Sequence, residues 1–321
     1  MSKQFFERID FSGEIDEISK LVCERYNLGK LKKSELILFG YEDFNFKLET
    51  SEGKYLVKVF GKFRSMADCQ RYINVMEKMV DANVSTPALL KSKEGFLLIC
   101  TLEGKQLRLC VTRFIEGKNL FQVGKPLNEK EIRFLAGEIA KINQIDYKPP
   151  FIYDSWAATN FFKEYKEKGD KLDSEDKTLL ESFFKKFKDL KIETLPHSFV
   201  HGDIIPPNVI KDKDDTLWII DFSCSNYFPR IQDLAVLAYG LLLNDDEEIS
   251  KRNLKIALEE YQKFVKLTPK EIAAFPMYVK LVCAINTLRP YYEKVVNHNT
   301  AKENEYFLYI GRRGLKQNIS Y

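Results

Sequence analysis

Three polar side chains in the second half of the chain could act together chemically. Asp203 and Asn208 lie in the segment FVHGDIIPPNVI, and Asp221 ends the apolar run LWIID. The polar turn KDKDDT between NVI and LWIID predicts a β-hairpin, which would return the chain to its start and bring Asp221 close to Asn208. Two carboxylates and one amide oxygen are the hard ligands that Mg²⁺ prefers. The pattern therefore predicts a magnesium site.

Two adjacent prolines separate the first acid from the amide. Pro206 and Pro207 keep this segment from becoming a helix and restrict its backbone, which lowers the entropic cost of holding Asp203 and Asn208 in place. We therefore expect a stiff loop that presents an acid and an amide to a common ligand.

The elements that position this loop divide into two regions. Strand-like runs and one helical stretch (66–82) follow a leading helix at 14–27. From about residue 128 helical spacing dominates, including 175–190 and 250–315. We expect an α+β protein with a small antiparallel-sheet lobe that has one main helix (residues 1–113) and a larger, mostly helical lobe (residues 114–321). The expected hinge is VTRFIEG, residues 111–117.

The composition excludes several classes of protein. Hydrophobic residues make up 45% of the chain and charged residues 30%, with a net charge of +3, which is too balanced for a dedicated nucleic-acid binder. The six cysteines form no CxxC pair and are expected to be reduced. The N-terminal segment lacks the apolar core of a signal peptide, and no apolar run approaches the roughly 18–20 residues that span a bilayer. We expect a cytoplasmic protein without nucleic-acid or membrane partners.

Other segments have structural interpretations. The acidic run NDDEEIS (244–250) predicts the first turn of a helix, where acids offset the helix dipole. The aromatic residues of RPYYEKV, together with Trp156, are interpreted as packed side chains rather than as a cage for a quaternary ammonium. GRRG near the end is interpreted as a solvated turn.

The quoted motifs resemble those of a known superfamily. HGDIIPPN followed by IIDF is similar to the His-x-Asp-(four residues)-Asn and Asp-Phe pair of the kinase-like small-molecule phosphotransferases. That superfamily includes aminoglycoside phosphotransferases, choline and ethanolamine kinases, and the second type of homoserine kinase. The resemblance extends from about residue 20 to about residue 245. It implies a bilobal protein-kinase-like fold and transfer of the γ-phosphate of ATP, with GTP possible, to a hydroxyl of a small metabolite.

The resemblance also implies roles for residues of the larger lobe. Asp203 would accept the proton of the acceptor hydroxyl, and Asn208 and Asp221 would hold Mg²⁺. His201 would support the loop. Asp233, in RIQDLAVLAY, would brace the loop from the start of a helix.

In the smaller lobe the resemblance implies a nucleotide site. Lys58 of YLVKVF matches the lysine that contacts the α- and β-phosphates. Backbone groups of Arg113, Phe114 and Ile115 would meet the purine. The turn GYEDFN carries a single glycine, which departs from the glycine-rich loop of protein kinases, and Asn45 is the expected phosphate contact there.

The acid that should pair with Lys58 is ambiguous. The simplest register against the aminoglycoside enzymes places Tyr72 at the position of the family's glutamate, which leaves Glu77 or Asp68 as candidates. A lysine without an acidic partner would favour a different class of protein, a kinase-like nucleotide-binding module without transfer activity.

Two segments of the smaller lobe favour an amino alcohol as the substrate. The stretches GYEDFNFKLETSEGKYLVKVF and VMEKMVDANVSTP are similar in spacing to homoserine kinases of the second type, so homoserine or a similar amino alcohol is the first candidate. An aminoglycoside kinase or a choline or ethanolamine kinase is the alternative. We expect a monomer or a homodimer.

Overall fold

The computed structural model describes residues 6–37 and 43–321, and the chain divides into two compact units, Met1–Glu116 and Gly117–Tyr321. The boundary expected from the sequence lay between residues 113 and 114. Most of the turn predicted at Gly40–Asp43 lies outside the described residues. The elements are those of an α+β protein with an antiparallel sheet in the first unit and mostly helices in the second.

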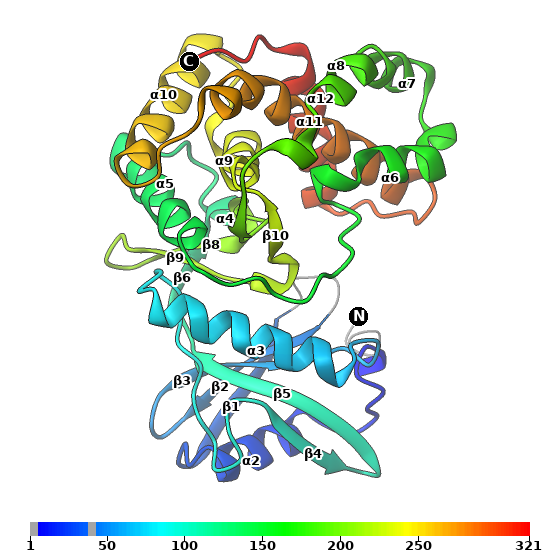
Figure 1. The fold of residues 1–321 in the computed structure, drawn as a ribbon. Helices are drawn as coiled ribbons and strands as arrows, with labels where there is room; N and C mark the ends of the chain where they lie inside the picture. Colours follow the sequence, from blue (N-terminus) through cyan, green and yellow to red (C-terminus); the bar gives the residue numbers. More distant parts are fainter. Residues whose placement is uncertain (1–5, 38–42) are drawn as a thin grey trace. The chain divides into compact units, whose positions relative to one another are not determined.

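The first unit is built on a five-stranded antiparallel sheet (Figure 1). Its strand order is β1-β2-β3-β5-β4. The bounds are β1 Leu31–Leu36, β2 Phe44–Thr50, β3 Lys54–Val59, β4 Leu98–Leu102 and β5 Lys105–Arg113.

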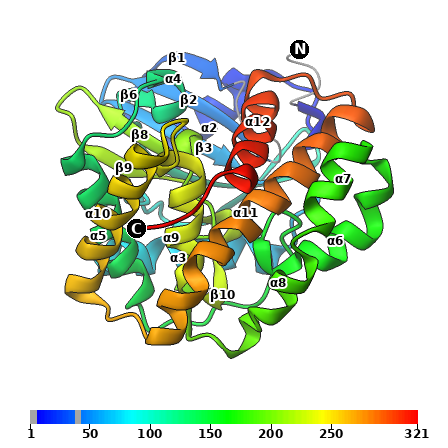
Figure 2. The ribbon, with the colours of Figure 1, turned by 90° about the horizontal axis from the view of Figure 1, so that it is seen from above.

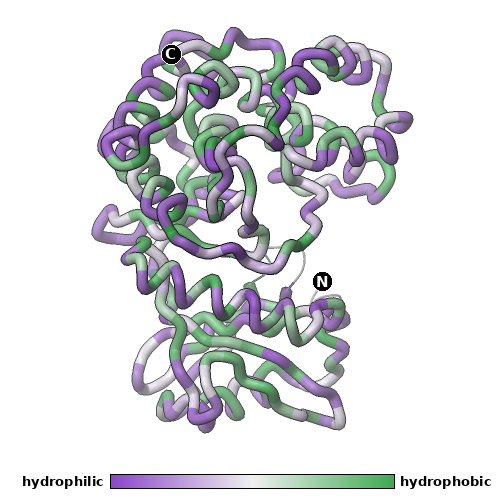
Figure 3. The backbone as a smooth tube through the Cα atoms, in the orientation of Figure 1, coloured by the Kyte–Doolittle hydropathy of each residue, from purple (hydrophilic) through white to green (hydrophobic). Residues whose placement is uncertain are grey.

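Helices α2 and α3 lie on opposite faces of the sheet (Figure 1). Alternate residues of β2, namely Phe44, Phe46 and Leu48, are fully buried in a core shared with α2 (Ile15–Arg25). The other residues of β2 therefore project from the opposite face, which α3 (Met66–Asp81) covers. Figure 3 shows hydrophobic residues along these strands.

The second unit is mostly helical, with two small sheets (Figures 1 and 2). Strand β7 pairs with β10, and β6 pairs with β8, which pairs with β9. The strands are β6 Gly117–Asn119, β7 His197–Val200, β8 Val209–Asp212, β9 Leu217–Ile219 and β10 Asn226–Pro229. The α-helices are α4 Leu120–Val123, α5 Glu129–Asn143, α6 Phe161–Lys168, α7 Ser174–Glu181, α8 Phe184–Asp189, α9 Ile231–Leu237, α10 Glu247–Phe264, α11 Pro269–Val295 and α12 Lys302–Lys316.

Two predicted helices can be compared in detail with the structure. The stretch 175–190 forms two helices, α7 and α8, rather than one. The acidic run at 244–250 does begin a helix, because Asp246 caps α10 by accepting hydrogen bonds from the N–H groups of Glu248 and Ile249.

Helix α11 is the long central helix of this unit (Figure 2). Its 27 residues make it the one helix among the described residues that is long and apolar enough to cross a membrane, but 61% of its most apolar window is buried inside the protein. This burial is typical of the core helix of a folded domain, and we interpret α11 in this way.

The GRRG segment lies inside α12, so its interpretation as a solvated turn is wrong. Gly311 and Gly314 are buried against α11, and a Cβ at Gly311 would lie 2.6 Å from the Asn286 carbonyl oxygen. The glycines allow the two helices to approach closely. Arg312, which lies between these glycines, instead forms an ion pair with Asp176 of α7 at 2.6 Å.

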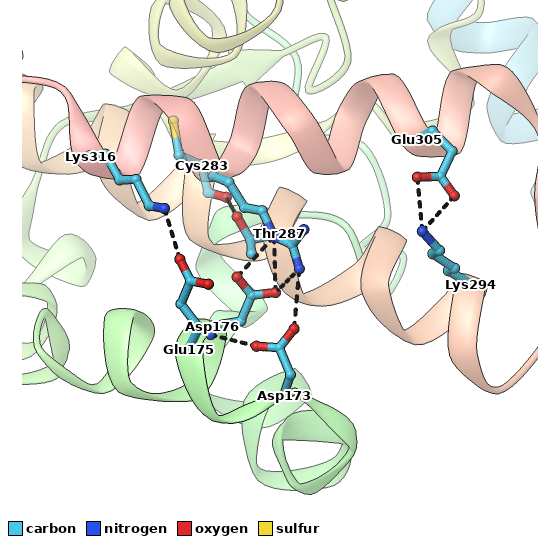
Figure 4. Close-up of polar contacts among 9 residues, drawn as sticks. Asp173, Glu175, Asp176, Cys283, Thr287, Lys294, Glu305 and Lys316 are labelled. Carbon is cyan, nitrogen blue, oxygen red and sulfur yellow. Dashed lines mark hydrogen bonds and ion pairs between the residues drawn. The ribbon is translucent and has the colours of Figure 1, made fainter.

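Ion pairs connect α12 to its neighbours (Figure 4). Lys316 contacts Glu175 of α7 at 2.9 Å, and Glu305 contacts Lys294 of α11 at 2.9 Å. Because these pairs are exposed, each contributes little to stability.

Candidate active site

The β7–β10 pair leads directly into the His201–Gly202–Asp203 segment, which follows β7. Gly202 has φ +87°, and an added Cβ would lie 3.3 Å from the carbonyl oxygen of Cys224. A residue with a side chain would be strained in this backbone conformation. Glycine is therefore required between the histidine and the acid.

The predicted hairpin is confirmed. β8 pairs antiparallel with β9, and the Ile220 N–H donates to the Asn208 carbonyl at 3.0 Å. Pro206–Asn208 forms a single 3₁₀ turn immediately before β8. Asp221 directly follows Ile220, the backbone partner of Asn208. The hairpin therefore brings Asp221 close to Asn208 along the chain, as we expected from the polar turn.

Asp203 and Asn208 are in direct contact. The Asn208 Nδ2 donates to Asp203 Oδ2 at 2.7 Å and to the Asp203 carbonyl oxygen at 3.0 Å. Both side chains are half-buried. Since the amide NH₂ is directed to Asp203, its carbonyl oxygen Oδ1 points away from the acid and is oriented to accept from or coordinate another group.

Asp221 has an unusual backbone conformation, with φ 65° and ψ 75°. Residues other than glycine rarely adopt this left-handed region, and such residues concentrate at functional sites. The Ser223 hydroxyl donates to Asp221 Oδ1 at 2.7 Å and orients the carboxylate. No motif in the sequence pointed to Ser223.

His201 links the two halves of the site as a neutral ring. Its Nδ1 accepts the N–H of Asp203 at 3.1 Å, and its Nε2 lies 3.3 Å from the Ile220 carbonyl oxygen, to which it donates. The ring is fully buried and lies 4.4 Å from the Phe222 ring, centroid to centroid. Burial lowers the pKa of His201 to about 4, so the ring carries no charge at neutral pH.

Asp233 holds the HGD segment from α9. Its Oδ1 accepts the N–H of Gly202 at 2.8 Å and its Oδ2 accepts the N–H of His201 at 3.0 Å. Asn143, at the end of α5, donates to the same Oδ2 at 3.1 Å. Burial raises the pKa of Asp233 to about 6, against the opposing effect of these donors. No sequence pattern pointed to Asn143, because its role depends on how α5 packs.

The donor set of this unit fits a hard cation. Asp203, Asn208 and Asp221 contribute carboxylate and amide oxygens, which suit Mg²⁺. Within residues 6–37 and 43–321, no group of three or more His, Cys, Asp or Glu side chains could hold a metal ion, so the set depends on the Asn208 amide. The orientation of that amide, with its NH₂ on Asp203, leaves the oxygen for a metal.

In the first unit, the structure corrects the predicted partner of Lys58. Its Nζ lies 2.8 Å from Oδ2 of Asp43, which precedes β2, rather than pairing with Glu77 or Asp68 of α3. Asp68 accepts from the backbone N–H and hydroxyl of Ser65 in the cap of α3. One signal could have identified Asp43: two-residue alternation along β2 places it on the face opposite Phe44.

Tyr72 does face Lys58, as the register predicted. The Lys58 Nζ lies 5.0 Å from the centroid of the Tyr72 ring, within cation–π distance. A ring face gives weaker orientation than a carboxylate, so the acid near β2 matters more for the position of the lysine.

Two buried polar atoms lie on the same face of the sheet as Lys58. Asn45 is directly opposite Lys58 in the β2–β3 register, and Thr112 is opposite Leu56 in the β3–β5 register. Asn45 Oδ1 and Thr112 Oγ1 have no hydrogen-bond partner among the described residues. Buried polar atoms usually have a hydrogen-bond partner, so these two are exceptions in this sheet; the phosphate contact of Asn45 stays a prediction.

The predicted purine contacts at the hinge require one correction. The Phe114 N–H donates to the Lys54 carbonyl at 3.0 Å, so this donor is already used within the sheet. Arg113 belongs to β5, where it pairs with Tyr55, and Ile115 follows it by two positions. The carbonyl of Phe114 and the groups of the two flanking residues remain candidates for contact with a purine.

The first unit has a five-stranded sheet with a paired lysine, and the helical unit has the HGD loop, the Asn208 amide and the acid after the hairpin, Asp221. These features define the kinase-like phosphotransferases. The chain belongs to the phosphotransferase enzyme family, which matches residues 35–264. It is therefore an enzyme of the small-molecule kinase class.

Its relatives include homoserine kinases and kinases of other small molecules. The chain is 23% identical over 278 residues to a homoserine kinase of Parvibaculum lavamentivorans, covering 83% of this chain and 82% of that one. It is 25% identical over 283 residues to a homoserine kinase of Methylorubrum populi, with the same coverage of 83% and 82%.

Solved structures share the fold. An amicoumacin kinase in complex with AMP-PNP, Ca²⁺ and amicoumacin superposes with a TM-score of 0.70 at 16% identity, over 100% of this chain and 98% of that one. A microcompartment-associated aminopropanol kinase superposes with a TM-score of 0.68 at 13% identity, over 94% and 95%.

Proposed function

We propose that this protein transfers the γ-phosphate of ATP to the hydroxyl of a small amino alcohol, with homoserine as the first candidate. The observation that carries the proposal is the contact of Asp203 with Asn208 beside the hairpin acid Asp221. The homoserine kinases, which match more than four-fifths of the chain, support the choice of acceptor.

The residues have distinct roles in this proposal. Asp203 accepts the proton of the acceptor hydroxyl as the oxygen bonds to the γ-phosphorus and the bond to the β-phosphate oxygen breaks, releasing ADP. Asn208 and Asp221 would hold Mg²⁺, which supplies charge neutralisation on the phosphates when bound. Lys58 contacts the α- and β-phosphates.

The proposal includes alternatives for acceptor and donor. Aminoglycoside and choline or ethanolamine kinases are the alternative acceptor classes, supported by solved structures of a spectinomycin phosphotransferase and a choline kinase with TM-scores of 0.64 and 0.60. GTP is the alternative donor. The proposed location is the cytoplasm, as a monomer or homodimer that binds neither nucleic acid nor membrane.

The binding-module alternative loses the feature that favoured it. That alternative depended on a lysine without an acidic partner, and Lys58 is paired with Asp43. It would regain support only if nucleotide bound without turnover of any acceptor.

The test is ADP release over a panel of homoserine, other amino alcohols, choline, sugars and aminoglycosides, with ATP and GTP as donors. We expect one amino alcohol to stimulate release, and Asp203→Asn to lower the stimulated rate by roughly a hundredfold or more. A stimulated rate that is unchanged in Asp203→Asn would contradict the role of this residue. Nucleotide binding without stimulation by any acceptor would favour the binding module.

A further inference from the structure

The segment that enters β2 carries an acid with an unusual number of partners. Asp43 is 5% exposed, and its carboxylate joins three parts of the first unit. Oδ2 accepts from Lys58 Nζ at 2.8 Å, and Oδ1 accepts from Arg64 Nε at 2.8 Å and from the Gly61 N–H at 3.0 Å. Three donors to one carboxylate indicate that Asp43 is a fixed, buried acid rather than a solvated one at the start of a strand.

Lys58 needs a partner of this kind because it is buried. Its side chain is 10% exposed, and that of Asp43 is 2% exposed. A buried ammonium without a counter-charge is strongly unfavourable, whereas a hydrogen-bonded partner lets it stay charged in one position. The neighbouring cations and their hydrogen bonds outweigh the effect of burial and hold the pKa of Asp43 well below its usual range.

Helix α3 does not supply this partner. From α3, Lys58 receives the ring face of Tyr72 at 5.0 Å, and Asp68 caps the helix by bonding to Ser65. The lysine is thus held by a carboxylate next to the sheet, whereas the two candidates that the sequence left open, Glu77 and Asp68, lie on the helix.

From this geometry we propose that Asp43 is the positioning residue of Lys58, and that Arg64 shares its carboxylate as a second cation of the same nucleotide-phosphate site. The inference rests on the proposed function, since it assumes that Lys58 contacts the phosphates. A carboxylate beside Lys58 also offsets its charge, and by itself this would weaken the attraction of Lys58 for a phosphate. In this proposal the acid is retained because the fixed position of the ammonium matters more for phosphate binding than the charge that the acid offsets.

The test measures Mg·ATP affinity by calorimetry for Asp43→Asn, which keeps the shape of the side chain and removes its charge. We expect affinity to fall by roughly tenfold, because a charged hydrogen-bond partner of a buried lysine is lost. The matched control is Glu49→Gln, the same change at a half-buried acid of β2, which should leave the affinity unchanged. Urea unfolding of each variant shows whether it folds.

A double-mutant cycle separates positioning from general stabilisation. If Asp43 acts mainly through Lys58, Asp43→Asn will lower affinity clearly less in the Lys58→Met background than in the wild type, and the remaining loss is the part that passes through Arg64. Equal losses in both backgrounds would overturn the inference, as would a higher affinity in Asp43→Asn. The inference would also be overturned if Glu77→Gln lowered Mg·ATP affinity tenfold while Asp43→Asn left it unchanged.

The outcomes also distinguish this inference from the proposed function. A wild-type protein that binds neither ATP nor ADP would overturn the proposed function and this inference with it. Wild-type binding of ATP together with unchanged affinity in Asp43→Asn would overturn the inference alone.

Discussion

Asn208 donates two hydrogen bonds to Asp203, from Nδ2 to Oδ2 at 2.7 Å and to the backbone carbonyl oxygen at 3.0 Å. The amide therefore orients the acid while its own oxygen is directed elsewhere. One side chain thus serves two purposes, fixing the proposed base and offering a ligand for a cation. Substitutions at Asn208 that keep one of these two roles and remove the other can distinguish the orientation of Asp203 from the binding of a cation.

Asn208→Asp should impair the proposed base without altering the shape of the site. A second carboxylate at the 2.7 Å contact would repel Asp203 and raise the pKa of the pair. We expect the acidic limb of the kcat–pH profile to move to higher pH, with a loss of roughly a hundredfold at neutral pH. Asn208→Ala is the comparison: it removes a hydrogen-bond donor but adds no charge, so it should lose activity and move that limb less. An unmoved limb in Asn208→Asp would contradict the prediction.

Asp221→Ala should remove the metal dependence of nucleotide binding. The variant loses one of the proposed carboxylate ligands, so Mg²⁺ should no longer increase ATP affinity. Calorimetry with and without Mg²⁺ measures this directly. Asp212→Ala, at the exposed end of the same hairpin, is the control, because Asp212 contacts Trp218 and the turn instead. Retention of wild-type Mg·ATP affinity in Asp221→Ala would exclude this acid from the site.

His201 should make the protein less stable as the pH falls from about 6.5 to about 4. Burial lowers its pKa from 6.5 to about 4, so the unfolded state binds more protons than the folded state in this range. The stabilisation is complete above pH 6.5 and decreases as the pH falls toward 4. One unit of pKa difference corresponds to about 1.4 kcal/mol, so the total is roughly 3–4 kcal/mol.

Asp233 titrates in the same range with the opposite sign, since its raised pKa of about 6 gives a contribution that is lost as the pH rises. The comparison of wild type with His201→Gln therefore isolates the histidine. The free energy of unfolding in urea, measured from pH 7.5 to 4.5, should fall less steeply in the variant. Parallel curves would show that His201 does not carry the effect.

Gly240→Ala should displace the loop that carries Asp203. Gly240 lies in a π-helical turn, Ala238–Leu242, and an added Cβ would lie 3.2 Å from Pro206 Cδ and 3.3 Å from Ile205 Cγ2. We expect kcat to fall roughly tenfold, because small displacements of a reacting group are costly.

The matched control for this change is Gly137→Ala in α5. Its added Cβ would approach nothing closer than Phe264 Cε2 at 4.0 Å, so it should raise stability by about 0.5–1 kcal/mol and leave kcat unchanged. Equal kcat values for Gly240→Ala and wild type would show that the loop accommodates the methyl group.

Much of the fold could be predicted because its signals are local. The strand-like runs of the first region predicted the antiparallel sheet, and the polar turn KDKDDT predicted the hairpin before Asp221. Contacts between distant segments could not be predicted in this way. Asn143 reaches Asp233 only because α5 packs beside α9, and this contact leaves no trace in the spacing of residues.

The errors have the same cause. GRRG has the composition of a turn, but the buried glycines serve the close approach of α12 to α11, which only the tertiary structure reveals. Likewise, the partner of Lys58 was sought on α3, whereas the structure supplies Asp43. Local composition predicts what a segment can form, and packing decides which neighbour it meets.

The Lys58–Asp43 pair has a consequence for control of the enzyme. In protein kinases the lysine pairs with a glutamate on a helix, and movement of that helix switches activity. Here one charge lies on β3 and the other at the start of the adjacent β2, so sliding or rotating α3 would disturb the ring of Tyr72 and leave the ion pair joined. The position of the lysine is therefore fixed when β2 and β3 pair, and does not depend on an acid carried by α3.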